Sequence, residues 1–132
     1  MNPQNLLYAK THEWVYVESG PKGEKTATVG ISDFALKTLT DLVYLNLPDV
    51  GRQVQAGQPF GEIESVKAVS DLYSPVVGEV VAANDPITQN LETLSQDPYG
   101  AGWLIKIRIA DEAGLSELLD YAAYQKQIAE EG

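Results

Sequence analysis

Short runs of apolar and β-branched residues, each interrupted by proline, glycine or polar turn residues, restrict the fold of this chain most. The segments with strand character are residues 13–18, 26–31, 42–47, 60–66, 68–72, 76–81 and 103–110. In the last segment every second residue from Trp103 to Ile109 is large and apolar, which is the period of a half-buried strand. Because no repeated strand–helix–strand pattern occurs, the sequence predicts a compact β sandwich or flattened barrel.

Two segments have helical character. Residues 32–37 begin with Ser32, whose side chain can cap the free amides, and with Asp33, whose charge suits the positive end of the helix dipole. In the tail, apolar residues recur at helical spacing, at Leu115, Leu118, Leu119, Ala122, Ile128 and Ala129. We expect these helices to pack at the edge of the β structure.

The length of the chain favours one domain. Its 132 residues suffice for a single modest core, and no linker or low-complexity segment divides them. We therefore predict one domain over residues 1–132, with residues 1–7 flexible and residues 111–130 forming a helical tail. Asp111 and Asp120 are candidate caps for two short helices in that tail.

The charge and composition exclude several functions. With a formal net charge of −10, the chain lacks the clustered cations that nucleic acids or anionic membranes attract. It has no cysteine, which excludes disulfides, cysteine-based zinc sites and thiol catalysis. Its only histidine, His12, cannot build a histidine-rich metal site, so we expect no metal site. The first residues lack the basic start and apolar run of a secretory signal, so we expect no secretory or transit segment. We expect a bacterial cytoplasmic protein, or a mitochondrial matrix protein that has lost a transit peptide.

Lys67 stands out because it is the only basic residue between Gln53 and Ile105, a stretch that holds seven acids. It lies between two predicted strands, where a hairpin tip should expose its long, flexible side chain. On charge pattern alone, however, an isolated lysine on a hairpin is more often a solvated charge or a guard against edge pairing.

A family resemblance changes this weighing. Residues 64–68 (Glu-Ser-Val-Lys-Ala), followed by Ser70 and Asp71, resemble the lipoylation motif of glycine cleavage H proteins. Further segments resemble that family in the same order, at residues 11–15, 29–32, 45–51, 73–80, 97–99 and 102–107. The resemblance covers residues 8–129, with two departures. Thr40 stands where many members have glycine, and the loop over residues 19–25 is longer than in the most compact members.

The resemblance implies a barrel-sandwich hybrid of the lipoyl/biotinyl-like type, mainly β, with a short helix in the N-terminal half and C-terminal helices. It implies that lipoate is attached covalently, as an amide, to Lys67. It also implies that Thr11, Glu13 and Asp71 receive the amine end of the loaded arm in a cleft. A carboxylate suits a cationic amine because charge-assisted hydrogen bonds are strong.

The implied function is that of a non-catalytic carrier. It takes an aminomethyl group from the pyridoxal-phosphate enzyme glycine decarboxylase to a tetrahydrofolate-dependent aminomethyltransferase, and then takes the dithiol to dihydrolipoamide dehydrogenase. Lipoate-attaching enzymes would be further partners. We expect a monomer that binds neither nucleic acid nor membrane.

Three alternatives remain from the sequence. Lipoyl domains of 2-oxoacid dehydrogenases usually have aspartate before the lysine, and biotin carriers have methionine on both sides, whereas Val66 and Ala68 flank Lys67 here. An H-like protein that relays lipoyl groups to other enzymes is barely distinguishable, although Glu13 and Asp71 favour the cleavage carrier. An unmodified binding module with Lys67 merely exposed is the remaining alternative.

Overall fold

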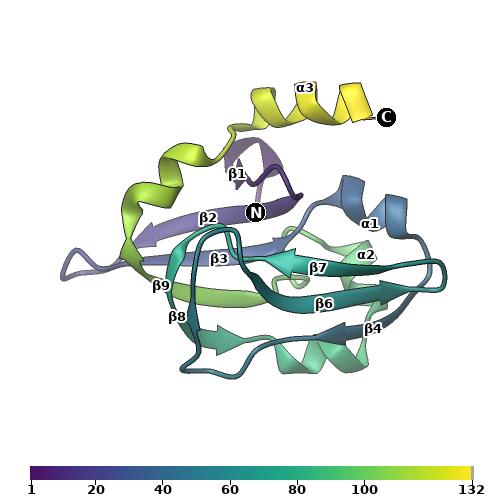
Figure 1. The fold of residues 1–132 in the computed structure, drawn as a ribbon, viewed down its shortest axis with the longest axis horizontal. Coiled ribbons are helices and arrows are strands. Elements are labelled where there is room, and N and C mark those ends of the chain that lie inside the picture. The colour runs from purple at the N-terminus through teal and green to yellow at the C-terminus, as the bar shows by residue number, and fades with distance from the viewer. Residues whose placement is uncertain (132) are drawn as a thin grey trace.

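The computed structural model describes residues 1–131, which form two antiparallel β-sheets with short helices around them (Figure 1). The larger sheet has the strand order β1-β2-β3-β9-β8-β5, and the smaller sheet has the order β4-β6-β7. The strands are β1 (Leu7–Tyr8), β2 (Glu13–Ser19), β3 (Lys25–Ile31), β4 (Leu42–Asn46), β5 (Gln53–Val54), β6 (Pro59–Ser65), β7 (Val69–Tyr73), β8 (Val77–Ala83) and β9 (Ile105–Asp111). The helices are η1 (Pro3–Asn5), α1 (Asp33–Leu39), η2 (Asp85–Gln89), α2 (Glu92–Gln96), η3 (Glu112–Glu117) and α3 (Tyr121–Glu131). The predicted mainly β architecture with a short early helix and C-terminal helices is confirmed.

The main core consists mostly of apolar residues from the segments that the sequence predicts to be strands. β2 pairs with β3 along its whole length, from Glu13 opposite Ile31 to Ser19 opposite Lys25. β3 then pairs with β9, and β9 with β8, which joins segments far apart in the chain. Core residues with at most 1% exposure are Val15, Ala27, Val29, Phe60, Ile63, Val76, Val80, Leu94, Leu104, Ile105 and Ile107. Each large apolar side chain buried here contributes about 1.5–3 kcal/mol of transfer free energy.

A second, aromatic cluster joins the two ends of the chain. The rings of Tyr8 and Tyr124 stack with centroids 4.3 Å apart and planes 2° from parallel. Trp14 is fully buried beside them, and its indole N–H donates to the carbonyl of Pro98 at 2.9 Å. The flexibility predicted for residues 1–7 stays a prediction; within that segment Leu6 is only 2% exposed and packs in this cluster.

Helix α3 packs mainly through a residue that its spacing does not predict, although the predicted Ile128 packs against the same cluster. Its one buried residue within residues 1–131 is Tyr124, whereas Ala122 and Ala129 are exposed. The large ring buries more apolar area than alanine can, so it determines which face of the helix turns inward. The predicted cap at Asp120 is present, since its Oδ1 accepts from the backbone N–H of Ala123 at 2.8 Å. In Figure 1, α3 lies above β1, and it contacts β1 and η1.

Candidate functional site

Lys67 lies in the turn between β6 and β7, the hairpin whose tip reaches the right-hand edge of Figure 1. Its side chain is exposed, and its neighbours Val66 and Val69 are 74% and 60% exposed. Within residues 1–131, Lys67 takes part in none of the ion pairs. Its amine is therefore open to solvent and to a modifying enzyme.

The backbone beneath Lys67 is tightly held, although the side chain is free. Ser65 is 6% exposed, and its Oγ accepts from the backbone N–H groups of Lys67 at 3.3 Å and of Ala68 at 3.1 Å. The backbone N–H of Ser65 donates to the carbonyl of Ala68 at 2.8 Å, and that of Val66 donates to the carbonyl of Asp41 at 2.9 Å. A serine-anchored turn of this kind needs no Asn-Gly pair. The hairpin thus presents the exposed side chain of Lys67 on a backbone that is held by hydrogen bonds.

The residue before Asp41 is the departure noted above, Thr40. It has φ 65° and ψ −126°, a conformation that glycine adopts freely and a β-branched residue resists. Its N–H closes α1 by donating to the carbonyl of Leu36 at 3.0 Å, and its Oγ1 donates to the carbonyl of Leu39 at 2.6 Å. Thr40 is therefore a strained helix cap. It precedes Asp41, whose carbonyl accepts from Val66 at the hairpin tip.

Glu13 begins β2 and is buried, with 2% of its surface exposed. Its Oε1 accepts a hydrogen bond from the Oγ1 of Thr11, and its Oε2 accepts from the backbone N–H of Tyr73 at 3.1 Å. Within residues 1–131, no basic side chain forms an ion pair with Glu13. The carboxyl group is thus satisfied by hydrogen bonds, and its charge is uncompensated.

Burial changes the acidity of this group. Loss of hydration raises the pKa of Glu13 from an ordinary value of 4.5 to about 7, while the hydrogen bonds from Thr11 and Tyr73 act in the opposite direction. The desolvation effect is larger because water is almost fully excluded, whereas two neutral donors replace only part of the lost hydration. Near neutral pH, Glu13 therefore titrates instead of remaining fully ionised.

Thr11, Glu13 and Asp71 line one cleft of about 400 Å³. Its other lining residues are His12, Ile31, Phe34, Ala35, Thr38, Leu39, Ile63, Ser70, Leu72 and Glu131. The three predicted residues do not contribute equally. Thr11 contacts Glu13 directly, whereas Asp71 is exposed, lies opposite Glu62 in the β6–β7 pairing, and has no hydrogen bond to either residue. Asp71 is therefore a rim residue, and Glu13 is the buried acid of the cleft, with the exposed Thr11 hydrogen-bonded to it.

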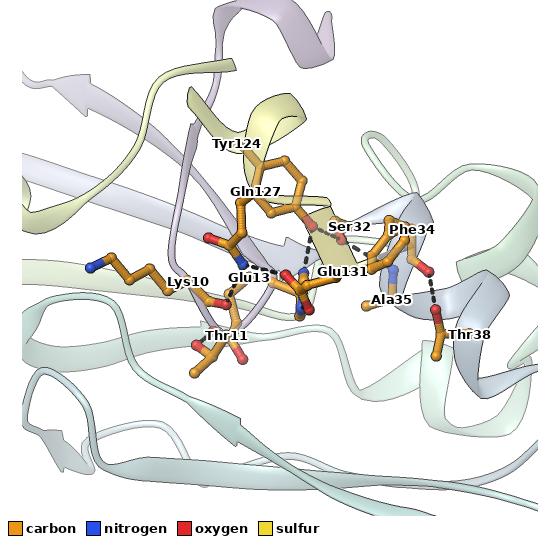
Figure 2. Close-up of polar contacts among 11 residues, drawn as sticks. Lys10, Thr11, Glu13, Ser32, Phe34, Ala35, Thr38, Tyr124, Gln127 and Glu131 are labelled. Carbon is orange, nitrogen blue, oxygen red and sulfur yellow. Dashed lines mark hydrogen bonds and ion pairs between the residues drawn. The ribbon is translucent and has the colours of Figure 1, made fainter. Parts of the chain in front are cut away.

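His12 and Glu131 also line this cleft, although the sequence does not predict a binding role for either residue. Figure 2 shows Glu131 descending from α3 towards Thr11 and Glu13, with Phe34 and Thr38 of α1 beside them. The only local signal for His12 is its place between Thr11 and Glu13. Glu131 has no local signal, because it is more than one hundred residues away in the chain.

The described side chains offer binding and attachment chemistry. Within residues 1–131, no group of histidine, cysteine and acidic residues can hold a metal ion, and no helix there is long and apolar enough to cross a membrane. What they do present is an exposed primary amine on a fixed hairpin and a largely apolar cleft containing carboxyl groups. The amine can be acylated, and the cleft can hold a cation away from water.

Comparison with known proteins identifies the family. The model of the glycine cleavage H-protein family matches residues 6–131. The chain belongs to this family. It is 53% identical to the glycine cleavage system H protein of Rhodopirellula baltica over 132 residues, covering 99% of this chain and 98% of that protein. It is 49% identical to the H protein of Rubrobacter xylanophilus, covering 98% and 96% of the two chains. The crystal structure of the H protein from Mycobacterium marinum superimposes with a TM-score of 0.86 at 38% identity, covering 97% of this chain and 99% of that one.

Family membership confirms the resemblance and supplies the function. The chain is the lipoyl shuttle of the glycine cleavage system, a non-catalytic carrier in a family that bears a lipoyllysine. Its partners are the glycine decarboxylase, the aminomethyltransferase and the dihydrolipoamide dehydrogenase of that system. Membership also sets aside the 2-oxoacid dehydrogenase and biotin-carrier interpretations, since these belong to other families.

Proposed function

We propose that Lys67 is the attachment point of the lipoyl group and that the cleft formed with Thr11, Glu13 and Asp71 receives the amine end of the loaded arm. The lipoyl disulfide supplies the redox and group-carrying chemistry when it is bound. The protein supplies the tether, the fixed geometry beneath it and a place to store the cargo. The observation that supports this assignment best is the exposed, unpaired Lys67 on a hairpin whose backbone is held on both sides.

The attachment is tested by intact mass. We expect the parent protein, made in a cell that ligates lipoate, to gain one lipoyl increment, because the Lys67 amine is free to be acylated. Lys67→Arg keeps the positive charge but cannot form that amide, so it should gain none. Lys37→Arg is the matched control, since Lys37 is also exposed but sits on α1 in an ion pair with Asp33. An increment that survives Lys67→Arg would contradict the assignment.

The cleft lies within reach of an arm on Lys67. Asp71 follows Lys67 by four residues, mostly along β7, which at about 3.3 Å per residue places the rim roughly 13 Å from the attachment point. An extended lysine side chain carrying a medium-length acyl chain spans such a distance. The apolar lining, from Ile63 and Leu72 among others, suits the hydrocarbon part of the arm.

The polar end of the cleft suits the cargo. An aminomethyl group ends in an amine that is cationic near neutral pH, and Glu13 has no cationic partner among residues 1–131. A cation beside Glu13 would favour its ionised form and lower its pKa from about 7. The amine and carboxyl group would then form a charge-assisted hydrogen bond shielded from water, which protects the cargo from hydrolysis.

The rate at which the loaded arm loses its aminomethyl group tests whether the cleft protects it. We expect formaldehyde release from the loaded arm to be about tenfold faster in Glu13→Gln, because hydrogen bonds to charged groups contribute about 1.5–3 kcal/mol. Glu18→Gln is the matched control, as Glu18 lies in the same strand but is exposed and does not line the cleft. Equal release rates in both variants and the parent would remove Glu13 from the cargo site.

Reconstitution tests the carrier role as a whole. We expect glycine-dependent decarboxylation with the partner enzymes to proceed with the parent protein and to stop with Lys67→Arg. We further propose that the protein works in the bacterial cytoplasm, since the relatives described above are bacterial proteins. Cell fractionation of the native host with an antibody to this chain checks that location.

A further inference from the structure

The C-terminal helix forms one wall of the arm cleft. Its last described residue, Glu131, lines the cleft together with Glu13 although the two are far apart in sequence. Figure 2 shows Tyr124, Gln127 and Glu131 on the side of α3 that faces the cleft residues. The helix is held there from Gln127, whose Nε2 donates to the carbonyl of Lys10 at 2.9 Å. Helix α3 is therefore attached to the turn that precedes Glu13.

The carboxylate of Glu131 is held in a defined position. Its Oε2 accepts from Nε2 of Gln127 at 2.7 Å, and its Oε1 lies 3.1 Å from Nε2 of His12. An ionised carboxylate can only accept, so Nε2 of His12 must carry the proton. In a neutral imidazole Nδ1 then accepts from the hydroxyl of Tyr124 at 2.8 Å, and that hydroxyl oxygen accepts from Oγ of Ser32 at 2.6 Å. This chain of hydrogen bonds runs from the start of α1 to the end of α3.

The position of Glu131 is unfavourable for the helix itself. Carbonyl groups at a helix C-terminus favour cations, yet the last turn of α3 has no basic residue and ends in Glu130 and Glu131. Residues that break such a local rule while being held by a specific network are expected at functional sites. The only side chains that hold Glu131 are His12 and Gln127, so within residues 1–131 no lysine or arginine neutralises it.

Glu13 and Glu131 also differ in acidity. The hydrogen bond from Gln127 lowers the pKa of Glu131, with a smaller contribution from His12, whereas burial raises the pKa of Glu13 to about 7. Near neutral pH, Glu131 is the carboxylate that is already ionised before any cargo arrives. It can attract a cation at the cleft mouth, while Glu13 becomes ionised as the cation settles inside.

We propose that Glu131 is a second carboxylate contact for the cationic end of the loaded arm, held at the cleft mouth by His12 and Gln127. This inference rests on the proposed role of the cleft as the cargo site. It assigns the C-terminal helix a part in cargo storage beyond its packing on β1. It also gives His12 a positioning role, which acts through Glu131 and involves no contact with the cargo.

The test compares Glu131→Gln with Glu130→Gln in the fully lipoylated protein. Glutamine keeps an oxygen that can accept from His12 but removes the charge, and Glu130 is an exposed neighbour on α3 that does not line the cleft. The arm is loaded from glycine labelled with ¹³C at the methylene carbon. Two quantities are measured, namely the rate of formaldehyde release and the pKa of the arm amine from the ¹³C shift against pH.

We expect Glu131→Gln to release formaldehyde about two- to fivefold faster, the range that a partly exposed charge pair gives, and to lower the pKa of the arm amine. Glu131→Asp, which keeps the charge on a shorter side chain, should restore part of both effects. Glu130→Gln should match the parent. A purely structural role for Glu131 would leave the amine pKa unchanged once unfolding measurements show equal stability.

The outcomes separate this inference from the proposed function. If Glu13→Gln accelerates release but Glu131→Gln changes neither quantity, the second contact is refuted and the cleft role stands. If neither variant changes either quantity, the cleft role is itself refuted. If Glu131→Gln unfolds the end of α3, the comparison is made with Glu131→Asp, whose amine pKa must then lie below that of the parent, because the charge is further away.

Discussion

The buried Glu13 should make this protein less stable as the pH rises from about 4.5 to about 7. In the folded state its pKa is about 7, against 4.5 for an ordinary glutamate, so folding disfavours the ionised form. Below about pH 4.5 both states are protonated, and the group costs nothing. Between pH 4.5 and 7 only the unfolded state loses its proton, and the free energy of unfolding falls. Above pH 7 the loss is complete, on the order of 3 kcal/mol at 1.36 kcal/mol per pKa unit.

Glu13→Gln removes this titration. Urea unfolding of parent and variant is measured at several pH values between about 4.5 and 8.5. The direct cost of the substitution cancels when the difference between the two proteins is followed with pH. We expect that difference to move in favour of the variant by on the order of 3 kcal/mol from the acidic to the basic end.

Glu18→Gln in the exposed end of the same strand is the control for general charge effects. It removes one negative charge from the same highly acidic chain without touching the cleft. A parent–variant difference for Glu13→Gln that is flat across pH, or no larger than that of the control, would refute the claim that the Glu13 carboxyl is buried and uncompensated.

Three further outcomes follow from the structure. Thr40→Gly should raise the free energy of unfolding in urea by on the order of 1 kcal/mol by relieving the positive φ, whereas Thr38→Gly in exposed α1 should lower it by a few tenths of a kcal/mol. Gly30→Ala should lower the melting temperature, with a cost of about 1–3 kcal/mol, because the new Cβ would lie 2.3 Å from the buried ring of Trp14. Turnover with the partner enzymes should slow as salt rises from about 0.05 M to 0.5 M if the acidic surface steers docking; salt-independent rates would count against steering.

Local sequence patterns predict one strand, one hairpin and one helix cap of this structure. The alternation from Trp103 to Ile109 marks β9, and the break between the strand-like runs around Lys67 marks the β6–β7 hairpin. Ser32 caps α1 as predicted, with its Oγ accepting from the N–H of Ala35 at 3.3 Å. These features follow from side-chain period and from hydrogen bonds within a few residues, so the sequence contains them directly.

Contacts between residues far apart in the chain cannot be predicted from such local patterns. Nothing near Tyr124 in sequence indicates that it stacks on Tyr8, or that its helix closes the cleft around Glu13. The strain at Thr40 is a property of a backbone dihedral angle, which cannot be read from one sequence. The acidity of Glu13 likewise depends on burial by residues from several elements, which strand pattern alone does not specify.

If the cleft receives the loaded arm as proposed, it must bind a cation reversibly, and the raised pKa of Glu13 suits that requirement. A carboxylate ionised at all times in a buried, uncompensated position would destabilise the empty protein and hold the amine strongly. A group with a pKa of about 7 is partly protonated when the cleft is empty and ionises when the amine enters. Part of the attraction is thereby spent on releasing a proton, so the net affinity is moderate. The arm can then leave the cleft for the next enzyme, and holding should weaken as the pH falls below 7.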